Sequence, residues 1–235
     1  MYRKKIYERY LTSDGFKNFD EIEKQFNSLF YLDDKIINNL PKNKNAKILD
    51  LGCGFGMYLK HIKNLGYKNT KGVEIGDEQN KFLKDKGYNI IQKDILEFLK
   101  TTTEKYDFIS MFDVLEHFTK EEIVELLPLL QKILNNNGTL IVRVPNGEAM
   151  LNGSIMYGDF THETFFTSKS LQQIFNIFNF SNTKIYPIYP IRHGIKSTIR
   201  YYGYKFYELI YKIGVIFETG GGQQFYFNQK YIGNY

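Results

Sequence analysis

Eleven residues, from Ala46 to Gly56, constrain the fold of this chain more than any other stretch. They read Ala-Lys-Ile-Leu-Asp-Leu-Gly-Cys-Gly-Phe-Gly, a short apolar run followed by three glycines at every second position. An apolar run bounded by glycine is typical of a buried strand, and the next residues, 57–65, are predicted to be helical. Glycine accepts positive φ and has no Cβ to hold a ligand away from the backbone. The stretch therefore predicts a strand, a tight turn and a helix, which open a nucleotide-binding βαβ unit.

The spacing of the glycines differs from that of a dinucleotide-binding turn, which reads G-x-G-x-x-G. Here the glycines read G-x-G-x-G, and an acid lies two residues before the first of them. This pattern resembles motif I of the class I S-adenosylmethionine (SAM)-dependent methyltransferases, whose ligand has no phosphate and carries a cationic amino-acid end. The resemblance implies SAM as the cofactor, bound by Asp50, Gly52, Cys53, Gly54 and Gly56.

Glu74 ends a strand predicted over 70–75 and lies 18 residues beyond Gly56. This is close to the ~20 residues expected for a ribose-binding acid in a βαβ unit. A carboxylate can accept two hydrogen bonds at once, which suits a vicinal diol. We expect Glu74, with Ile75 beside it, to bind the ribose; the alternative is a solvated acid at a strand end.

Two further predicted strands, over 88–92 and 106–112, also end in candidate cofactor residues. The resemblance implies that Asp94 and Ile95 contact the adenine and that Phe112 and Asp113 lie along the methionine part of SAM. Asp94 has a structural alternative as the N-cap of the helix that follows it. The resemblance covers residues 46–180 and is loose outside 46–190.

Strands are also predicted over 139–144, 183–189 and 224–232, with a turn at 135–138. Strands that alternate with helices in this way predict the α/β class. We expect a Rossmann-like, doubly wound, seven-stranded sheet with a helical insertion before the last strand. A single domain over 1–235 would then consist of an N-terminal helical cap (1–45), a SAM-binding core (46–190) and an aromatic, basic insertion (191–223).

Two histidines are candidates for the general base that an oxygen acceptor of high pKa requires. His162 lies on the predicted acceptor loop beside Glu163, and it is preferred. His117 follows the strand over 106–112 and is the alternative; an acceptor that has already lost its proton would need neither. The residues expected to bind the acceptor are Arg143, Asn146, Tyr157 and Arg192.

No metal is expected at this site. Metal-dependent methylation needs a cluster of hard ligands, and the acids considered for it, Asp113, Glu116, Asp159 and Glu163, are scattered along the sequence.

The sequence therefore predicts a SAM-dependent O-methyltransferase with a small polar acceptor. A sugar, a nucleotide-sugar or a phosphorylated precursor of surface polysaccharide is the acceptor class that the resemblance implies. The alternatives are an NAD-dependent oxidoreductase or epimerase, which the glycine spacing disfavours, and a methyltransferase for a lipid or quinone-like acceptor. Methylation of nucleic acid would call for an Asn/Asp-Pro-Pro-Tyr type of motif after the strand over 106–112, and the chain has Phe-Asp-Val-Leu there.

Composition and net charge limit the classes of partner that we expect. The formal net charge of +5 is modest, so it gives no reason to expect nucleic acid. One cysteine, Cys53, excludes an intramolecular disulfide and suits a cytoplasmic location. No apolar run reaches the length of a transmembrane segment. The insertion over 191–217 mixes basic and aromatic residues, and four interpretations stay open: a helix packed on its own domain, a cover for the acceptor site, a homodimer interface, or peripheral contact with a membrane surface.

Overall fold

A computed structural model describes residues 2–8, 34–149, 153–180, 182–188, 192, 194–219 and 230–234 of the chain. These residues contain a mixed sheet with the strand order β3-β2-β1-β4-β5-β7-β6. The strands are β1 (Ile48–Leu51), β2 (Thr70–Glu74), β3 (Ile90–Gln92), β4 (Tyr106–Phe112), β5 (Leu134–Pro145), β6 (Lys184–Pro187) and β7 (Lys230–Asn234). The helices are α1 (Tyr2–Tyr7), α4 (Asp34–Asn39), α5 (Met57–Asn64), α6 (Asp77–Asp85), α7 (Ile95–Thr101), η1 (Leu115–His117), α8 (Lys120–Ile133), α9 (Gly153–Met156), α10 (Ser168–Ile177) and α11 (Ile195–Thr219).

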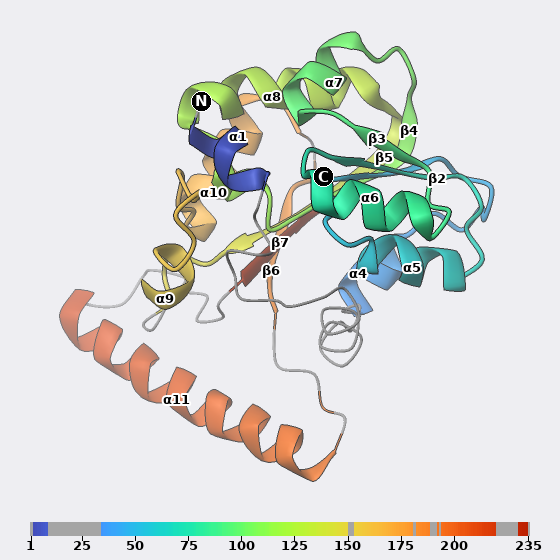
Figure 1. The fold of residues 1–235 in the computed structure, drawn as a ribbon. Helices are drawn as coiled ribbons and strands as arrows, with labels where there is room; N and C mark the ends of the chain where they lie inside the picture. Colours follow the sequence, from blue (N-terminus) through green and yellow to red (C-terminus); the bar gives the residue numbers. More distant parts are fainter. Residues whose placement is uncertain are drawn as a thin grey trace.

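The first five strands run parallel, and β7 runs antiparallel to β5 and β6. Helices cover both faces of the sheet (Figure 1). Adjacent strand residues point to opposite faces, because side chains alternate along a strand. Leu49 packs with the core under α7, α8 and α10, whereas Ile48 packs with the core that includes Ile36 of α4 and Ile62 of α5. The predicted doubly wound α/β class is thus confirmed.

The strand order reverses at β1, which has β2 on one side and β4 on the other. In an open α/β sheet, a crevice forms at such a point outside the carboxyl ends of the strands. The fold therefore places the glycine turn after β1 and the strand-end acids of β2 and β4 around one space.

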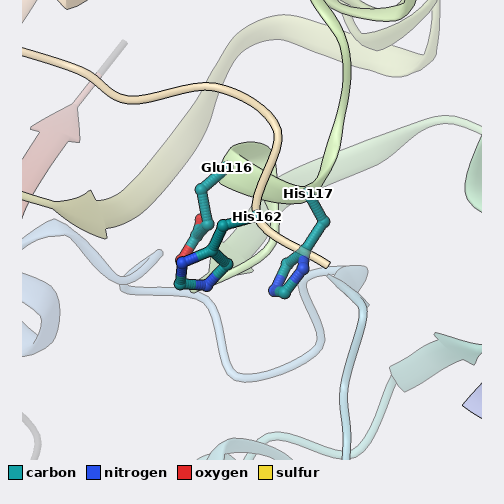
Figure 2. Close-up of side chains that lie close together, drawn as sticks. All are labelled: Glu116, His117 and His162. Atoms are coloured by element: carbon teal, nitrogen blue, oxygen red, sulfur yellow. The ribbon is translucent and has the colours of Figure 1, made fainter. Parts of the chain in front are cut away.

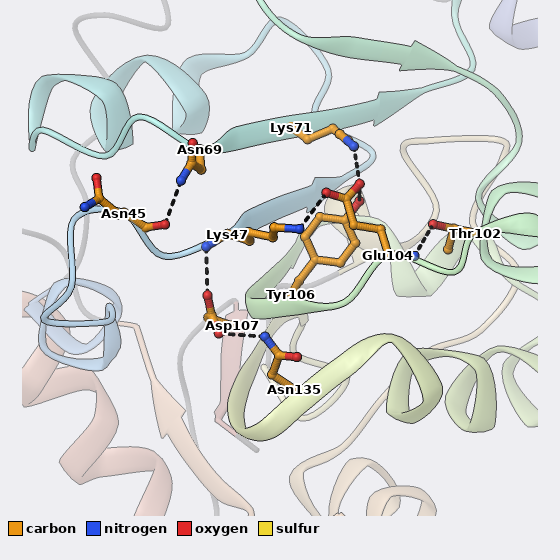
Figure 3. Close-up of polar contacts among 9 residues, drawn as sticks. All are labelled: Asn45, Lys47, Asn69, Lys71, Thr102, Glu104, Tyr106, Asp107 and Asn135. Atoms are coloured by element: carbon orange, nitrogen blue, oxygen red, sulfur yellow. Dashed lines mark hydrogen bonds and ion pairs between the residues drawn. The ribbon is translucent and has the colours of Figure 1, made fainter.

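At the amino-terminal ends of the strands, two carboxylates connect neighbouring strands, as Figure 3 shows. Glu104 pairs with Lys47 at 3.2 Å and with Lys71, whose ammonium group is the main cause that lowers the pKa of Glu104 below its ordinary value. Asp107 accepts hydrogen bonds from the Lys47 amide at 2.8 Å and from the Asn135 side chain at 2.7 Å. These contacts tie the amino ends of β1, β2 and β4 together and leave their carboxyl ends for the ligand.

The prediction of a turn over 135–138 is wrong. Strand β5 begins at Leu134 and runs through these residues, with a register shift opposite residues 106–108 of β4. Asn137 has φ 63°, a left-handed conformation that asparagine tolerates better than most residues. The register shift lies within β5, and the strand continues beyond it to Pro145.

The insertion forms one helix, α11, which Figure 1 shows at the side of the molecule, away from β1 to β4. It precedes β7, as predicted for an insertion before the last strand. Residues 224–229 of the predicted last strand and residues 9–33 of the predicted N-terminal helical cap lie outside the described residues. Among the residues that are described, no helix combines the length and the apolar character needed to cross a membrane.

Candidate active site

A cavity of about 330 Å³ lies at the carboxyl ends of β1, β2, β3 and β4. Residues from all four strand ends contribute to its wall, because parallel strands end at the same edge of the sheet. Of the residues predicted to bind the cofactor, those that line it are Asp50, Gly52, Cys53, Gly54, Glu74, Ile75, Asp94, Ile95, Phe112 and Asp113.

The glycine turn adopts backbone conformations that other residues rarely reach. Gly52, Gly54 and Gly56 have φ of 69°, 52° and 69°. A Cβ on Gly52 would lie 2.5 Å from a methyl carbon of Val114, whereas a Cβ on Gly54 would meet nothing within 4 Å. Gly54 thus leaves open space beside the backbone. Gly56, which is not in the cavity wall, is the N-cap residue of α5, and a Cβ on it would collide with the Leu83 side chain.

Glu74 bridges two backbone segments at the floor of the cavity. Its two carboxylate oxygens accept hydrogen bonds from the amides of Gly54 and Gly76, each at 2.8 Å. The side chain is 8% exposed, and burial raises its pKa, while the amide hydrogen bonds oppose that rise. Each oxygen keeps a lone pair for a ligand. The turn and the acid are therefore built as one unit.

Asp50 is a second buried acid, only 3% exposed, on the neighbouring strand end. The Ser110 hydroxyl donates a hydrogen bond to its Oδ1 at 2.8 Å. Burial is the main cause that raises the pKa of Asp50 from its ordinary value of 3.8 to about 7, and Glu74 adds to the rise. A cationic ligand group beside Asp50 would favour the ionised carboxylate and so reverse part of that shift.

Asp113 occupies a strained position at the end of β4. Its φ is 56°, in the left-handed region, where a residue with a side chain needs support from its surroundings. Arg143 of β5 supplies an ion pair at 2.6 Å, and its guanidinium lies 5.0 Å from the centre of the Phe112 ring. Arg143 is thus part of the cavity wall beside the predicted methionine site.

Asp94 is the N-cap of α7, the structural role that the sequence analysis gave as an alternative to adenine binding. Its side chain caps α7 by accepting a hydrogen bond from the Glu97 amide at 3.1 Å. It also lines the cavity together with Ile95. The two roles are compatible, since a carboxylate can accept several hydrogen bonds.

The two candidate histidines lie side by side, but His162 is not among the residues of the cavity wall. His117 ends η1 and lines the cavity, and the ring of His162 has its centre 4.8 Å from that of His117. The backbone carbonyl oxygen of the adjacent Glu116 accepts hydrogen bonds from the amides of Glu163 and Thr164, at 2.8 and 3.0 Å. These two bonds bring the loop after α9 against η1. Burial lowers the pKa of His117, which favours the neutral ring.

The remaining predicted residues lie elsewhere, and the structure does not bring them to the cavity. Asn146 is fully buried, with its side-chain oxygen accepting a hydrogen bond from the Glu148 amide at 2.7 Å. Tyr157 is 75% exposed, and Arg192 lies over the ring of Tyr201. Of the four residues expected to bind the acceptor, only Arg143 reaches the cavity.

Sequence reasoning missed several wall residues, among them Tyr7, Phe55, Tyr58 and Gln79. Tyr58 and Gln79 lie in the first turns of α5 and α6, directly after the strand ends that sequence reasoning did consider. Inspecting the first turn of each following helix would have found them. Tyr7 comes from α1, which belongs to the segment predicted as an N-terminal helical cap, but the sequence did not indicate which of its residues reaches the cavity.

Comparison with known proteins finds methyltransferases among the proteins that this chain is similar to. The sequence model of a family described as methyltransferase domain matches residues 24–185, which is more than half of the chain. An uncharacterized methyltransferase from Oceanobacillus iheyensis is 27% identical over 119 residues, which cover 50% of this chain and 55% of that protein. An uncharacterized protein from Rickettsia prowazekii is 32% identical over 112 residues, 44% of each protein. The chain thus spans about half the length of these curated relatives.

A solved structure shares the fold over nearly the whole chain. It is a SAM-dependent methyltransferase from Archaeoglobus fulgidus, with a TM-score of 0.66 and 20% identity, and the match covers 96% of this chain and 97% of that one. At this identity the likeness concerns the fold. It extends the agreement beyond the segment that the family model matches.

The raised pKa of Asp50 predicts a distinctive pH dependence of stability. The folded state holds this proton more tightly than the unfolded state, so the stabilisation is complete below about pH 4 and is lost as the pH rises through about 7. Asp50→Asn removes this loss. Relative to the wild type, the free energy of unfolding of the variant should therefore rise between pH 4 and pH 8, by an amount on the order of 4 kcal/mol if the whole shift is expressed.

Urea unfolding of both proteins across this pH range measures the difference. Because other titrating groups are common to both proteins, they cancel in that difference. A difference that stays constant with pH would show that Asp50 titrates in its ordinary range.

Proposed function

The chain belongs to the family of class I methyltransferase domains, and we propose that it transfers a methyl group from SAM to an oxygen of a small polar acceptor. SAM is the cofactor of this family; when bound, it supplies an electrophilic methyl group on a sulfonium ion. The acceptor atom and the acceptor class belong to the proposal.

One observation carries the proposal: two buried acids, Asp50 and Glu74, flank a glycine turn that leaves its ligand side open. Asp50 suits a ligand ammonium group, and Glu74 suits a vicinal diol. A pyrophosphate at the same place would put negative charge beside buried carboxylates, which is unfavourable. The electrostatics therefore support SAM and disfavour NAD.

The histidine pair supports transfer to an oxygen. An acceptor hydroxyl that takes a methyl group must lose its proton, and the sulfur that gives up the methyl leaves as a neutral thioether. We place His162, and next to it His117, where that proton departs, because the pair adjoins the cavity beside the end of β4. In the simplest form of the proposal, His162 takes the proton itself as a general base, with His117 as the alternative.

A sugar, a nucleotide-sugar or a phosphorylated precursor of surface polysaccharide is the proposed acceptor, and a cytoplasmic location goes with it. The support is the sequence resemblance and the polar loop at 159–164. Arg143 no longer supports an anionic acceptor directly, because its guanidinium is engaged with Asp113.

The face of α11 that points away from the domain supports a proposal about partners. Its apolar side chains recur at alternating spacings of four and three, and each is between 46% and 82% exposed: Ile195, Ile199, Tyr202, Phe206, Leu209, Ile213 and Ile216. This spacing is the heptad seam of a two-helix coiled coil. Buried residues of α11, such as Ser197 and Val215, lie on the opposite face.

We propose that a second copy of this chain covers the seam, so that the protein is a homodimer. A membrane surface is the competing occupant, because α11 also carries basic residues. Two of these, Lys205 and Lys212, form ion pairs of 3.0 Å with Glu208, whose side chain is 7% exposed. Glu208 therefore neutralises part of the positive charge of these two lysines, which favours a protein partner over an anionic lipid.

SAM binding can be tested through Glu74. In calorimetric titrations with S-adenosylhomocysteine (SAH), Glu74→Gln should weaken binding by about 2 kcal/mol or more, because a charged hydrogen-bond partner is lost. Glu104→Gln is the matched control: it makes the same change at the opposite edge of the sheet and should leave the affinity unchanged. NAD should give no heat. Equal SAH affinity in both variants would refute the assignment of Glu74.

The dimer can be tested at the middle of the seam. Multi-angle light scattering should give twice the mass of the chain for the wild type and the mass of one chain for Leu209→Glu, since a charge would be buried in the interface. Arg200→Glu, an exposed change on α11 outside the seam, should stay dimeric. A monomeric wild type that sediments with anionic vesicles at low salt and is released at high salt would assign the seam to a membrane surface instead.

A further inference from the structure

We propose that Glu116, His117 and His162 bind a divalent first-row cation, such as Zn²⁺ or Mn²⁺, at the acceptor side of the cavity. The three side chains each offer one ligand atom, and these atoms lie within 4.8 Å of one another. Figure 2 shows the three side chains gathered at one place, from η1 and from the loop after α9. Two imidazoles and one carboxylate form a donor set that suits such cations. The inference rests on the proposed function, and it replaces the general-base role proposed there for the histidines with the role of metal ligands.

The hydrogen bonds around His117 select the tautomer that a metal ligand needs. Its Nδ1 lies 2.8 Å from the hydroxyl oxygen of Thr161, and that hydroxyl donates its own hydrogen to Asp159 at 2.6 Å. The Thr161 oxygen can therefore only accept from His117, so Nδ1 carries the hydrogen and Nε2 carries the lone pair. In metal sites, the ring nitrogen of a histidine that does not bind the metal commonly donates a hydrogen bond, often toward a carboxylate, and this bond orients the ring. Here Thr161 connects Nδ1 of His117 to Asp159 in that way.

The same reasoning holds for His162 with a different partner. Its Nδ1 lies 3.0 Å from the carbonyl oxygen of Met156, and a carbonyl can only accept a hydrogen bond. Nδ1 is then the donor, and Nε2 of the neutral ring has its lone pair available for a cation. Both rings are thus held in the same tautomer by partners outside the cluster.

The third ligand is a deeply buried acid. Glu116 is 1% exposed and lies next to His117 in η1. An ionised carboxylate is costly to bury, and a divalent cation beside it lowers that cost. The backbone hydrogen bonds from Glu163 and Thr164 to the Glu116 carbonyl hold His162 against η1, so the three ligands are assembled by the fold before any ion arrives.

The position of the cluster gives the cation a role in methyl transfer. Since His117 lines the cofactor cavity, an ion held by the cluster would face that cavity, where we propose that the acceptor binds. Three protein ligands leave at least one coordination position open. An acceptor hydroxyl bound there would lose its proton to solvent more readily, and its oxygen would then attack the sulfonium methyl as the carbon–sulfur bond breaks. Adjacent hydroxyls, as in a sugar, suit an ion with two open positions.

This inference departs from the expectation of a metal-free site, which was argued from the acids alone. Asp113, Glu116, Asp159 and Glu163 are scattered in sequence, and only Glu116 belongs to the cluster. The histidines supply the other two ligands, and Asp159 acts behind one of them. Sequence reasoning weighed these histidines only as bases.

Calorimetry on the full chain, freed of metal with a chelator, tests the proposal with ZnCl₂ and MnCl₂ as probes. The wild type should bind one cation per chain, and His162→Ala, His117→Ala and Glu116→Gln should each weaken binding at least tenfold. His61→Ala, which removes a histidine of α5 outside the cavity, is the matched control and should bind like the wild type. Melting curves identify any variant that fails to fold, and the partly exposed His162 then carries the test.

SAH titrations of the same proteins separate this inference from the proposed function. Retained SAH binding with a tenfold or larger loss of cation affinity in His162→Ala, whose side chain is outside the cavity wall, would support the metal site. SAH binding without cation binding, or cation binding that the cluster variants leave unchanged, would overturn the metal site, and His162 would remain the proposed base. Failure of the wild type to bind SAH would instead count against the proposed function.

Discussion

The architecture of the site depends on one carboxylate. Glu74, at the end of β2, accepts hydrogen bonds from the amides of Gly54 and Gly76, which belong to the loops after β1 and β2. A buried acid is stable only when its oxygens are satisfied, so these two loops are held in fixed positions around it. Because the glycine turn is fixed, its open side at Gly54 and the neighbouring acid Asp50 are fixed as well. The cofactor site is therefore assembled by hydrogen bonds within the chain itself.

The cofactor side of the site could be predicted from the sequence because its determinants are local. Each strand end is marked by an apolar run and a polar residue, and parallel strands end at one edge of the sheet. Glu74 was placed by its spacing from the glycine turn, whereas Asp50, Asp94 and Asp113 were placed by what the family resemblance implies for the ends of their strands. The wall residues that were missed, such as Tyr58, required knowing which face of the next helix turns toward the cavity.

The acceptor side could not be predicted in this way, because its geometry depends on contacts between distant residues. Glu116 and His162 are brought together by two backbone hydrogen bonds from the loop after α9 to η1, and no local pattern announces such bonds. The same limit explains why the sequence did not show that Asn146 and Tyr157 lie outside the cavity wall. On α11 the pattern was present in the sequence, but which face is exposed became evident only from the packing of Ser197, Glu208 and Val215.

A crystal structure of the protein in complex with SAH would test the central claim most directly. The account predicts the ribose hydroxyls within hydrogen-bonding distance of the Glu74 carboxylate and the amino group of the homocysteine part beside Asp50. The sulfur should then lie on the side of the cavity that His117 lines. SAH bound in the reverse direction, or outside the space between β1, β2 and β4, would contradict the account.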